Sequence, residues 1–152
     1  MQKITPFLWF DKEAGEAAKF YTSVFKGKIK DKSIITDTPS GTVEIYTITI
    51  LGQEFMLMSA GPLFKFTEAI SFVVDCKNQK EIDYYWKRLS AVKKSEQCGW
   101  LKDKYGVSWQ IVPSALDELF EKDKSGRVLQ AMLKMKKINI KKLKQAYDQN
   151  KY

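Results

Sequence analysis

ITPFLWFDKEAGEAAKFYTSVF (residues 4–25) predicts a strand followed by a helix. The same order is predicted for a second stretch, AISFVVDCKNQKEIDYYWKRLS (residues 69–90), and these two stretches determine the expected fold. Aromatic and β-branched residues concentrate in 3–10 and again in 69–75, which predicts two strands. Asp11 then fits a helix start, and apolar residues recur at helical spacing after it and over 79–90. At an offset of 64 residues, Asp75 falls on Asp11 and Tyr85 on Tyr21. The repetition predicts two related modules, although shared patterning alone is the alternative explanation.

Further strand-like runs complete each module. Residues 29–36, 42–50 and 54–59 follow the first helix and are separated by glycine-containing turns. A run near 95–101 and a strand over 107–112 follow the second helix, and Gly106 matches Gly52 at an offset of 54. The expected fold class is α+β, with two repeated βαβββ modules (about 1–62 and 63–113) forming one domain over residues 1–120.

The C-terminal part is expected to be helical and basic. Ser114 and Asn139 fit helix N-caps, and a further helix is expected over 125–136. Residues 121–152 hold ten basic and three acidic side chains, a net of +7 within the total of +8. We expect 121–152 to be a basic helical extension packed on the domain. Contact with an acidic partner or RNA is the alternative, but no aromatic-rich basic groove favours nucleic acid.

The absence of histidine restricts the chemistry of the chain. It removes the commonest general base, the Ser–His and Cys–His nucleophile pairs and most transition-metal sites. Cys76 and Cys98 are too far apart in sequence for a paired-thiol motif. With no signal-like start and no apolar run of about 18 residues, the expected location is cytoplasmic and not in a membrane.

Four stretches carry a resemblance to a known family. They are residues 4–25, GPLFKFTEAISFVVDCKNQKEIDYYWKRLS (61–90), QCGWLKDKYGVSWQIVPS (97–114) and QAMLKMKKINIKKL (130–143). They resemble the PhnB-like (demethylubiquinone methyltransferase-type) branch of the vicinal-oxygen-chelate superfamily. That superfamily includes glyoxalase I, ring-cleaving dioxygenases and antibiotic-binding proteins, and the resemblance implies the glyoxalase/bleomycin-resistance-like fold.

The resemblance also implies where a metal would bind. The superfamily's three ligand positions fall on Thr5, Ala69 and Gln110, which cannot replace two imidazoles and a carboxylate. We therefore expect no metal, and an unexpected site that uses Glu54 or Glu68 is the alternative. The methyltransferase label would imply S-adenosylmethionine, but the chain has no Gly-rich strand-to-helix loop of the Rossmann type. We therefore expect no cofactor.

Strand alternation assigns side chains to a cavity between facing sheets. The inward residues expected to bind a ligand are aromatic, thioether, hydroxyl or amide side chains: Thr5, Phe7, Trp9, Met56, Met58, Ser71, Ser108 and Gln110. Glu54 is the only ionisable inward candidate, and in an apolar cleft its pKa would rise, which suits a proton shuttle. For each ligand-binding candidate the alternative is a purely structural role in the core. For Glu54 the alternative is a carboxylate at a solvated strand end. Lys102-Asp103-Lys104 is typical of a solvated turn.

These observations favour a metal-free protein that binds an apolar or aromatic small molecule and forms a homodimer. The alternative is an enzyme of the same fold, either a methyltransferase-type transferase or a metal-independent isomerase that uses Glu54. Whether the modules pair within one chain or exchange between two chains is left open.

Overall fold

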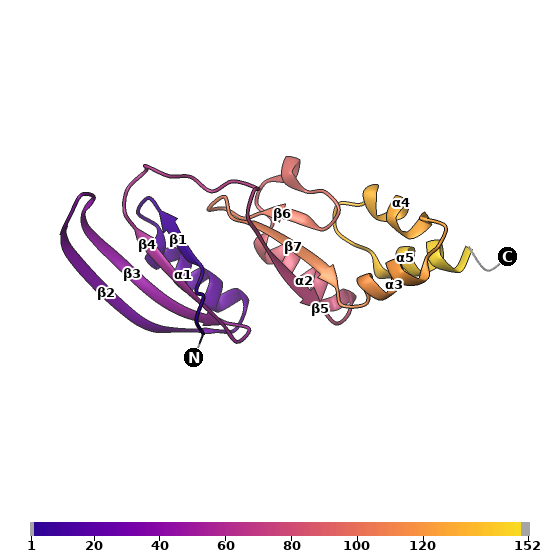
Figure 1. Ribbon diagram of the computed structural model, residues 1–152, viewed down its shortest axis with the longest axis horizontal. Helices are drawn as coiled ribbons and strands as arrows, with labels where there is room; N and C mark the ends of the chain where they lie inside the picture. The colour runs from indigo at the N-terminus through magenta and orange to yellow at the C-terminus, as the bar shows by residue number, and fades with distance from the viewer. Residues whose placement is uncertain (1, 150–152) are drawn as a thin grey trace. The chain divides into compact units, whose positions relative to one another are not determined.

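The computed structural model describes residues 2–149 and divides the chain into two compact units, Met1–Phe66 and Thr67–Tyr152. Unit 1 contains β1 (Phe7–Phe10), α1 (Ala14–Val24), β2 (Lys28–Thr38), β3 (Gly41–Ile50) and β4 (Gln53–Ser59). Unit 2 contains β5 (Ser71–Cys76), α2 (Gln79–Leu89), a 3-10 turn (Lys93–Ser95), β6 (Trp100–Lys102) and β7 (Ser108–Pro113). It ends with α3 (Leu116–Lys122), α4 (Arg127–Leu133) and α5 (Ile140–Asp148) (Figure 1). The α+β class is confirmed.

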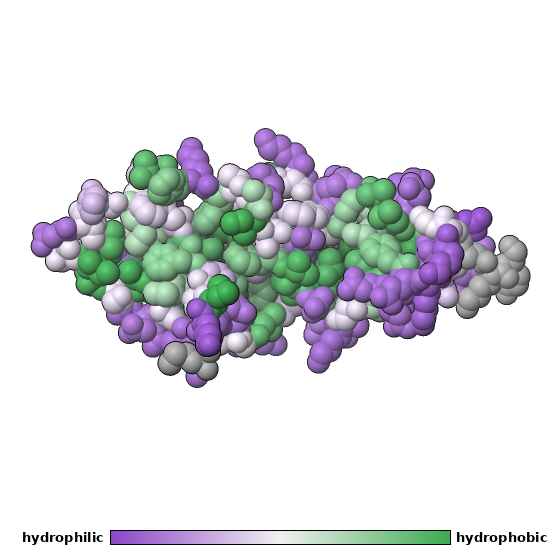
Figure 2. Space-filling view, viewed as in Figure 1, coloured by the Kyte–Doolittle hydropathy of each residue, from purple (hydrophilic) through white to green (hydrophobic). Residues whose placement is uncertain are grey.

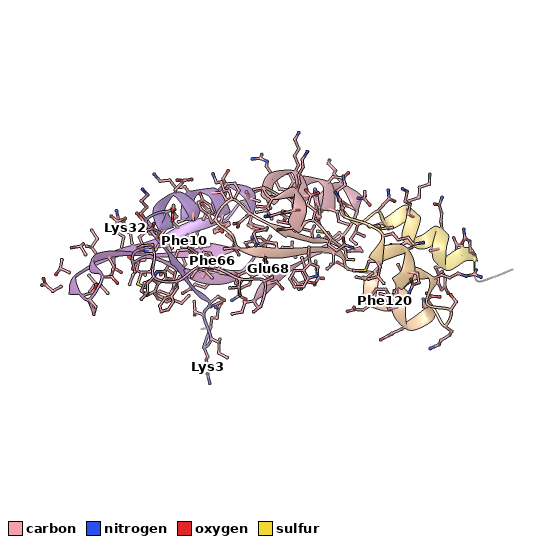
Figure 3. All side chains as sticks on the ribbon, turned by 90° about the horizontal axis from the view of Figure 1, so that it is seen from above. Lys3, Phe10, Lys32, Phe66, Glu68 and Phe120 are labelled. Atoms are coloured by element: carbon pink, nitrogen blue, oxygen red, sulfur yellow. The ribbon has the colours of Figure 1, made fainter. Side chains whose placement is uncertain are left out.

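Unit 1 is a four-stranded sheet with one helix on it. Its strand order is β1-β4-β3-β2, with β1 parallel to β4 and the other pairs antiparallel. Side chains of one parity, including Leu8, Ile48 and Leu57, are buried on the α1 side. The small side chains of Ala17 and Ala18 bring α1 close to the strands. Phe66 closes this core by packing edge-on against Phe10, with ring centroids 5.1 Å apart (Figure 3).

Unit 2 repeats the module with one strand fewer. Its sheet has the order β5-β7-β6, in which β5 is parallel to β7 as β1 is to β4. The second module thus runs β-α-β-β over the described residues, and the 3-10 turn stands where unit 1 has β2. Residues 91–96 (AVKKSE) lack the alternating apolar pattern of a strand, which explains the difference.

Two helix starts differ from the sequence prediction. Asp11 is exposed, and the Ala14 N–H donates instead to the Ser59 hydroxyl, 3.0 Å away at the end of β4. Ser114 does not cap α3, because its hydroxyl donates to the Cys76 carbonyl. The predicted cap at Asn139 is confirmed, since its side chain accepts a 3.0 Å hydrogen bond from the Lys142 N–H.

The helices of the C-terminal extension are part of unit 2. Val128, Ile138 and Leu143 are fully buried. The N–H groups of Cys98 and Gly99 donate to the carbonyls of residues 135 and 136, both over 2.8 Å. The extension is therefore fixed by backbone pairing as well as by apolar packing. That the two modules together form one domain stays a prediction.

No helix among residues 2–149 has the length and apolar character needed to span a bilayer.

Candidate functional site

One face of the unit 1 sheet presents aromatic and thioether side chains. Phe7 pairs with Met56 and Trp9 pairs with Met58 across the parallel β1–β4 ladder, which brings these four predicted residues together. Phe7 is 47% exposed and the other three are half-buried. The alternation predicted from the sequence is confirmed, because the residues between them face α1 and are buried. Figure 2 shows apolar side chains gathered over the strands of this unit.

Trp9 is held in place by two contacts. Its indole Nε1 donates a 2.8 Å hydrogen bond to the Gly61 carbonyl. Phe64 packs edge-on against the ring with centroids 4.9 Å apart. Because the indole N–H is already satisfied, Trp9 offers a ligand apolar surface rather than a donor.

A polar group of residues lies at one end of this face. The Gln2 amide donates to the Glu54 carbonyl, accepts from the Glu54 N–H (both 3.0 Å), and contacts the Thr5 hydroxyl at 3.4 Å. The Glu54 carboxylate pairs with the Lys30 ammonium at 3.1 Å, and its side chain is 34% exposed. The structure thus brings Thr5 and Glu54 together, and it gives Glu54 a charged partner instead of an apolar enclosure.

Sequence reasoning missed Gln2 and Lys30. Gln2 precedes the predicted strand, and no pattern marks it. Lys30 sits at a register shift between Ile29 and Asp31, where an inserted residue changes the direction of a side chain. A bulge of this kind is not visible in an alternation pattern.

Unit 2 brings the other predicted residues together. Ser71 pairs with Ser108 across the β5–β7 ladder, and the Gln110 amide donates a 2.9 Å hydrogen bond to the Ser71 hydroxyl. Ser108 is only 2% exposed, whereas Val73 on the same face is 58% exposed. Gln110 also pairs with Trp100 on β6. This face therefore combines hydroxyl and amide groups with an indole.

An ion pair borders this second face. The Lys102 ammonium bonds the Glu68 carboxylate and lowers the pKa of that carboxyl below its usual value. Glu68 is exposed, so the pair is screened by solvent.

Asp103 corrects the prediction of a solvated turn. It is 1% exposed, and its carboxylate accepts hydrogen bonds from the N–H groups of Tyr105 (2.8 Å) and Val107 (3.1 Å). A third bond of 2.9 Å comes from the Trp109 indole. The buried Asp103 carboxylate therefore stabilises the β6–β7 turn by hydrogen bonds to protein donors. The sequence signal that could have found it is the Asp-x-x-Gly turn followed by a buried tryptophan.

The two thiols differ in accessibility. Cys76 is fully buried, and burial, with smaller effects of the Glu81 and Asp75 carboxylates, raises the pKa of its thiol to about 12. Such a thiol is protonated near neutral pH and is no nucleophile. Cys98 is half-buried, at a backbone φ of 52°.

The superfamily's metal positions do not fit a metal in this chain. The Ala69 side chain has no ligand atom, and Gln110, whose amide nitrogen donates to Ser71, offers only a neutral amide oxygen. Thr5 supplies one neutral hydroxyl, which already contacts Gln2. No cluster of three or more His, Cys, Asp or Glu side chains occurs within residues 2–149. The residues at these positions lack the anionic or imidazole ligands that a catalytic divalent ion needs.

Comparisons with solved structures agree with this fold. A PhnB protein from Bacillus cereus is 36% identical, and the match spans 74% of this chain and all of that one, with a TM-score of 0.61. The fosfomycin resistance protein FosX from Listeria monocytogenes is 16% identical over 77% of this chain and 94% of its own, with a TM-score of 0.57. The same protein with manganese(II) and sulfate matches at 16% identity over 79% and 99% of the chains, with a TM-score of 0.55. At that identity the FosX matches show the fold alone.

A comparison with curated proteins gave no match. A family model described as 3-demethylubiquinone-9 3-methyltransferase matches residues 2–112, which cover both modules. Together with the Bacillus cereus match, this shows that the chain belongs to the 3-demethylubiquinone-9 3-methyltransferase family, the PhnB-like branch of the vicinal-oxygen-chelate superfamily.

Proposed function

We propose that this protein is a cytoplasmic homodimer that binds an apolar or aromatic small molecule on the open faces of its sheets, without a metal ion. The observation that carries the proposal is the grouping of Phe7, Trp9, Met56 and Met58 on one sheet face. Phe7 remains 47% exposed, although an aromatic ring gains stability from burial.

The chemistry of this face suits an apolar guest. Flat aromatic rings stack on one another, and flexible thioethers adapt to irregular shapes. The Trp9 indole is fixed by Gly61 and Phe64, so part of the surface is formed before a ligand arrives. Little ordering entropy is then lost on binding.

Polar groups would orient the ligand. Unit 1 supplies the Glu54–Lys30 pair at the end of its apolar face, and unit 2 supplies the Ser71–Gln110 hydrogen bond. A few polar points on an otherwise apolar lining are typical of small-molecule sites. None of these groups forms a nucleophile–base pair, which favours binding over turnover.

N-phenyl-1-naphthylamine, an uncharged aromatic probe, tests the binding proposal. Its fluorescence should rise saturably with one site per chain. Replacing Phe7→Ser together with Met56→Gln should weaken binding about tenfold, because about 1.4 kcal/mol of apolar contact is lost. A titration of fluorescence at fixed protein concentration measures both.

Leu51→Ser is the matched control. Leu51 is 61% exposed in the turn between β3 and β4, away from this face, so its replacement should leave the affinity unchanged. An equal loss in control and double variant, or no saturable signal at all, would contradict the proposal.

Exposed apolar residues support the homodimer. The edge strand β2 exposes Ile34 (57%) and Ile35 (46%), where a second copy would shield them. Sedimentation equilibrium of the full chain should give twice the 17.6 kDa chain mass. A monomer at micromolar concentration would refute this part of the proposal.

The family description favours one alternative, a methyltransferase-type enzyme. It requires measurable heat when S-adenosylmethionine is titrated into the protein. A metal-independent isomerase is the second version, in which Glu54 moves the proton. Glu54→Gln should then abolish turnover and keep ligand binding, whereas Lys30→Gln, which removes the ion pair but keeps the carboxylate, should retain turnover.

A further inference from the structure

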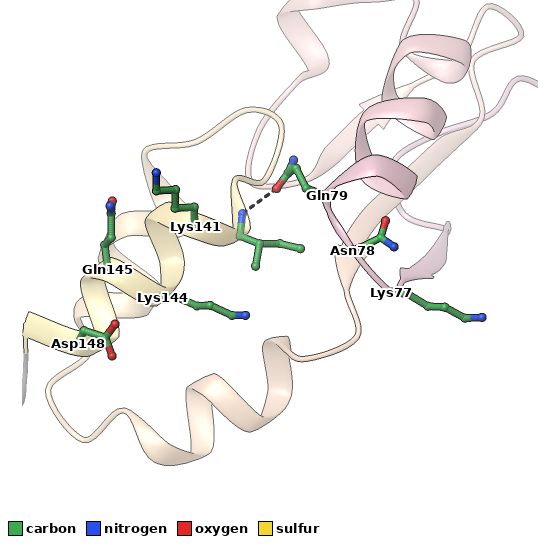
Figure 4. A pocket seen from close by; sticks show the side chains of 8 residues that line it. Lys77, Asn78, Gln79, Lys141, Lys144, Gln145 and Asp148 are labelled. Carbon is green, nitrogen blue, oxygen red and sulfur yellow. Dashed lines mark hydrogen bonds between the residues drawn. The ribbon is translucent and has the colours of Figure 1, made fainter.

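A hollow of about 500 Å³ lies in unit 2 between the start of α2 and one side of α5 (Figure 4). Seven of its eight lining residues have polar or charged side chains, while the surface that they present to the hollow is mostly hydrocarbon: Lys77, Asn78, Gln79, Ile140, Lys141, Lys144, Gln145 and Asp148. None of these residues belongs to the sheet faces described above. The volume lies within the range that holds a small organic molecule.

The charge of this hollow is unbalanced. Lys77, Lys141 and Lys144 have no ion-pair partner among residues 2–149. Asp148 is the single acidic residue of the lining, at the far end of α5 (Figure 4). Three lysines and one aspartate give a net charge of +2. Like charges collected in one concave site attract a counter-ion.

The backbone around the hollow is fixed by a side-chain clamp. The Gln79 amide donates to the Ile138 carbonyl and accepts from the Ile140 N–H, both at 2.9 Å. Ile138 and Leu143 are fully buried beneath it. The start of α2 therefore holds a fixed position relative to the backbone of Lys141 and Lys144. In Figure 4 the Lys144 side chain extends toward α2, whereas the exposed side chains of Lys77 and Lys141 extend outward and turn inward only when an anion binds.

The hollow depends on the C-terminal extension. The family model ends at residue 112, before α5, and the Bacillus cereus relative is fully covered by 74% of this chain. Five of the eight lining residues come from α5. Most of the site thus lies beyond the residues that the family model matches.

We propose that this hollow binds a small molecule that carries a phosphate group. Its three ammonium groups, with the amide nitrogens of Asn78 and Gln145, supply donors to an oxyanion with several acceptor oxygens. A phosphate monoester dianion balances the net charge of +2, whereas a carboxylate balances half of it. Since the lysines are exposed, binding is expected to be modest and sensitive to salt.

Phenyl phosphate and benzoate, titrated at constant ionic strength, test the proposal by amide chemical shifts of the full chain. Phenyl phosphate should shift the amides of Lys77–Gln79 and Lys141–Gln145 saturably, with a dissociation constant of about 1 mM or tighter. Benzoate should bind at least about fivefold more weakly. Equal affinities, or no saturation, would overturn the proposal.

Two matched double variants distinguish binding of the phosphate at the hollow from non-specific attraction of an anion to the basic extension. Lys141→Gln with Lys144→Gln should weaken phenyl phosphate binding about tenfold. Lys134→Gln with Lys142→Gln removes the same charge from exposed positions of the same extension that do not line the hollow, and should leave binding within about twofold. Equal losses in the two variants would overturn the proposal, as would a short RNA that binds tightly and loses affinity equally in both.

Discussion

At the scale of single residues, Asp103 shows how a charged side chain can belong to the core. Its neighbours Lys102 and Lys104 suggest a solvated turn, yet three protein donors surround its carboxylate. A buried charge is stable only when its acceptor oxygens are satisfied. Local composition predicts exposure here because the donor from Trp109 arrives only when β7 has folded beside the turn.

Asp103→Asn should be strongly destabilising. The amide can keep one acceptor oxygen but turns an NH₂ group toward protein donors, so charge-assisted bonds are lost. We expect a loss of about 2–4 kcal/mol in the free energy of unfolding, measured by urea denaturation. Asp75→Asn, at an exposed position of β5, should change it by less than about 0.5 kcal/mol. Similar effects of the two changes would contradict the internal role of Asp103.

The thiols should differ in reactivity. Near pH 8 iodoacetamide should modify Cys98 and spare Cys76, whose pKa of about 12 keeps it protonated. Because the folded-state pKa of Cys76 is raised above its ordinary value of 9.0, its contribution to stability is present below about pH 9 and is lost as the pH rises toward 12. Peptide mass spectrometry reads the modification. Rapid labelling of Cys76 in the native protein would refute its burial.

At the scale of elements, the sheet face on which each side chain lies was predictable from the sequence. The contacts between residues on different elements were not. Alternation placed Phe7 and Trp9 on one face and Leu8 and Phe10 on the other, as the structure confirms. The helix cap from Ser59 and the Lys30 bulge depend on partners distant in sequence. A local sequence pattern does not show which distant residues will be in contact, so the Glu54–Lys30 ion pair could not be predicted.

Gly99 fixes the extension to the sheet of unit 2. Its φ is +85°, and a Cβ atom would lie 3.0 Å from the Ile111 carbonyl oxygen and 3.1 Å from Ile138 Cγ1. Gly99→Ala should therefore lower the free energy of unfolding by about 2–3 kcal/mol, from backbone strain and steric contact together. Thermal and urea unfolding measure it.

Gly126→Ala is the control for Gly99→Ala. Gly126 also has a positive φ, +77°, but open space surrounds its Cβ position, so only backbone strain of about 1 kcal/mol is expected. If the two alanine variants lose equal stability, the packing of Ile138 against Gly99 does not contribute.

At the scale of the whole molecule, the sequence was informative about the family and the class of fold. Residues 4–25 and 69–90 predicted the repeated strand–helix units, and both exist. The third strand predicted for unit 2 is absent over the described residues, because the charged residues of AVKKSE (91–96) break the alternating apolar pattern that a strand needs. For the candidate site, strand alternation predicted which residues lie on each sheet face. Gln2, Lys30 and the basic hollow depend on contacts between residues distant in sequence, which the sequence pattern does not show.

The chain has no histidine and carries neutral side chains at Thr5, Ala69 and Gln110, and on these residues rests our proposal that it works without a metal ion. Calorimetric titration of manganese(II) into the chelator-treated protein tests this proposal, since the fold neighbour FosX was solved with that ion. We predict no saturable heat up to about 1 mM manganese and unchanged binding of N-phenyl-1-naphthylamine. Stoichiometric manganese binding that disappears in Gln110→Ala would contradict it.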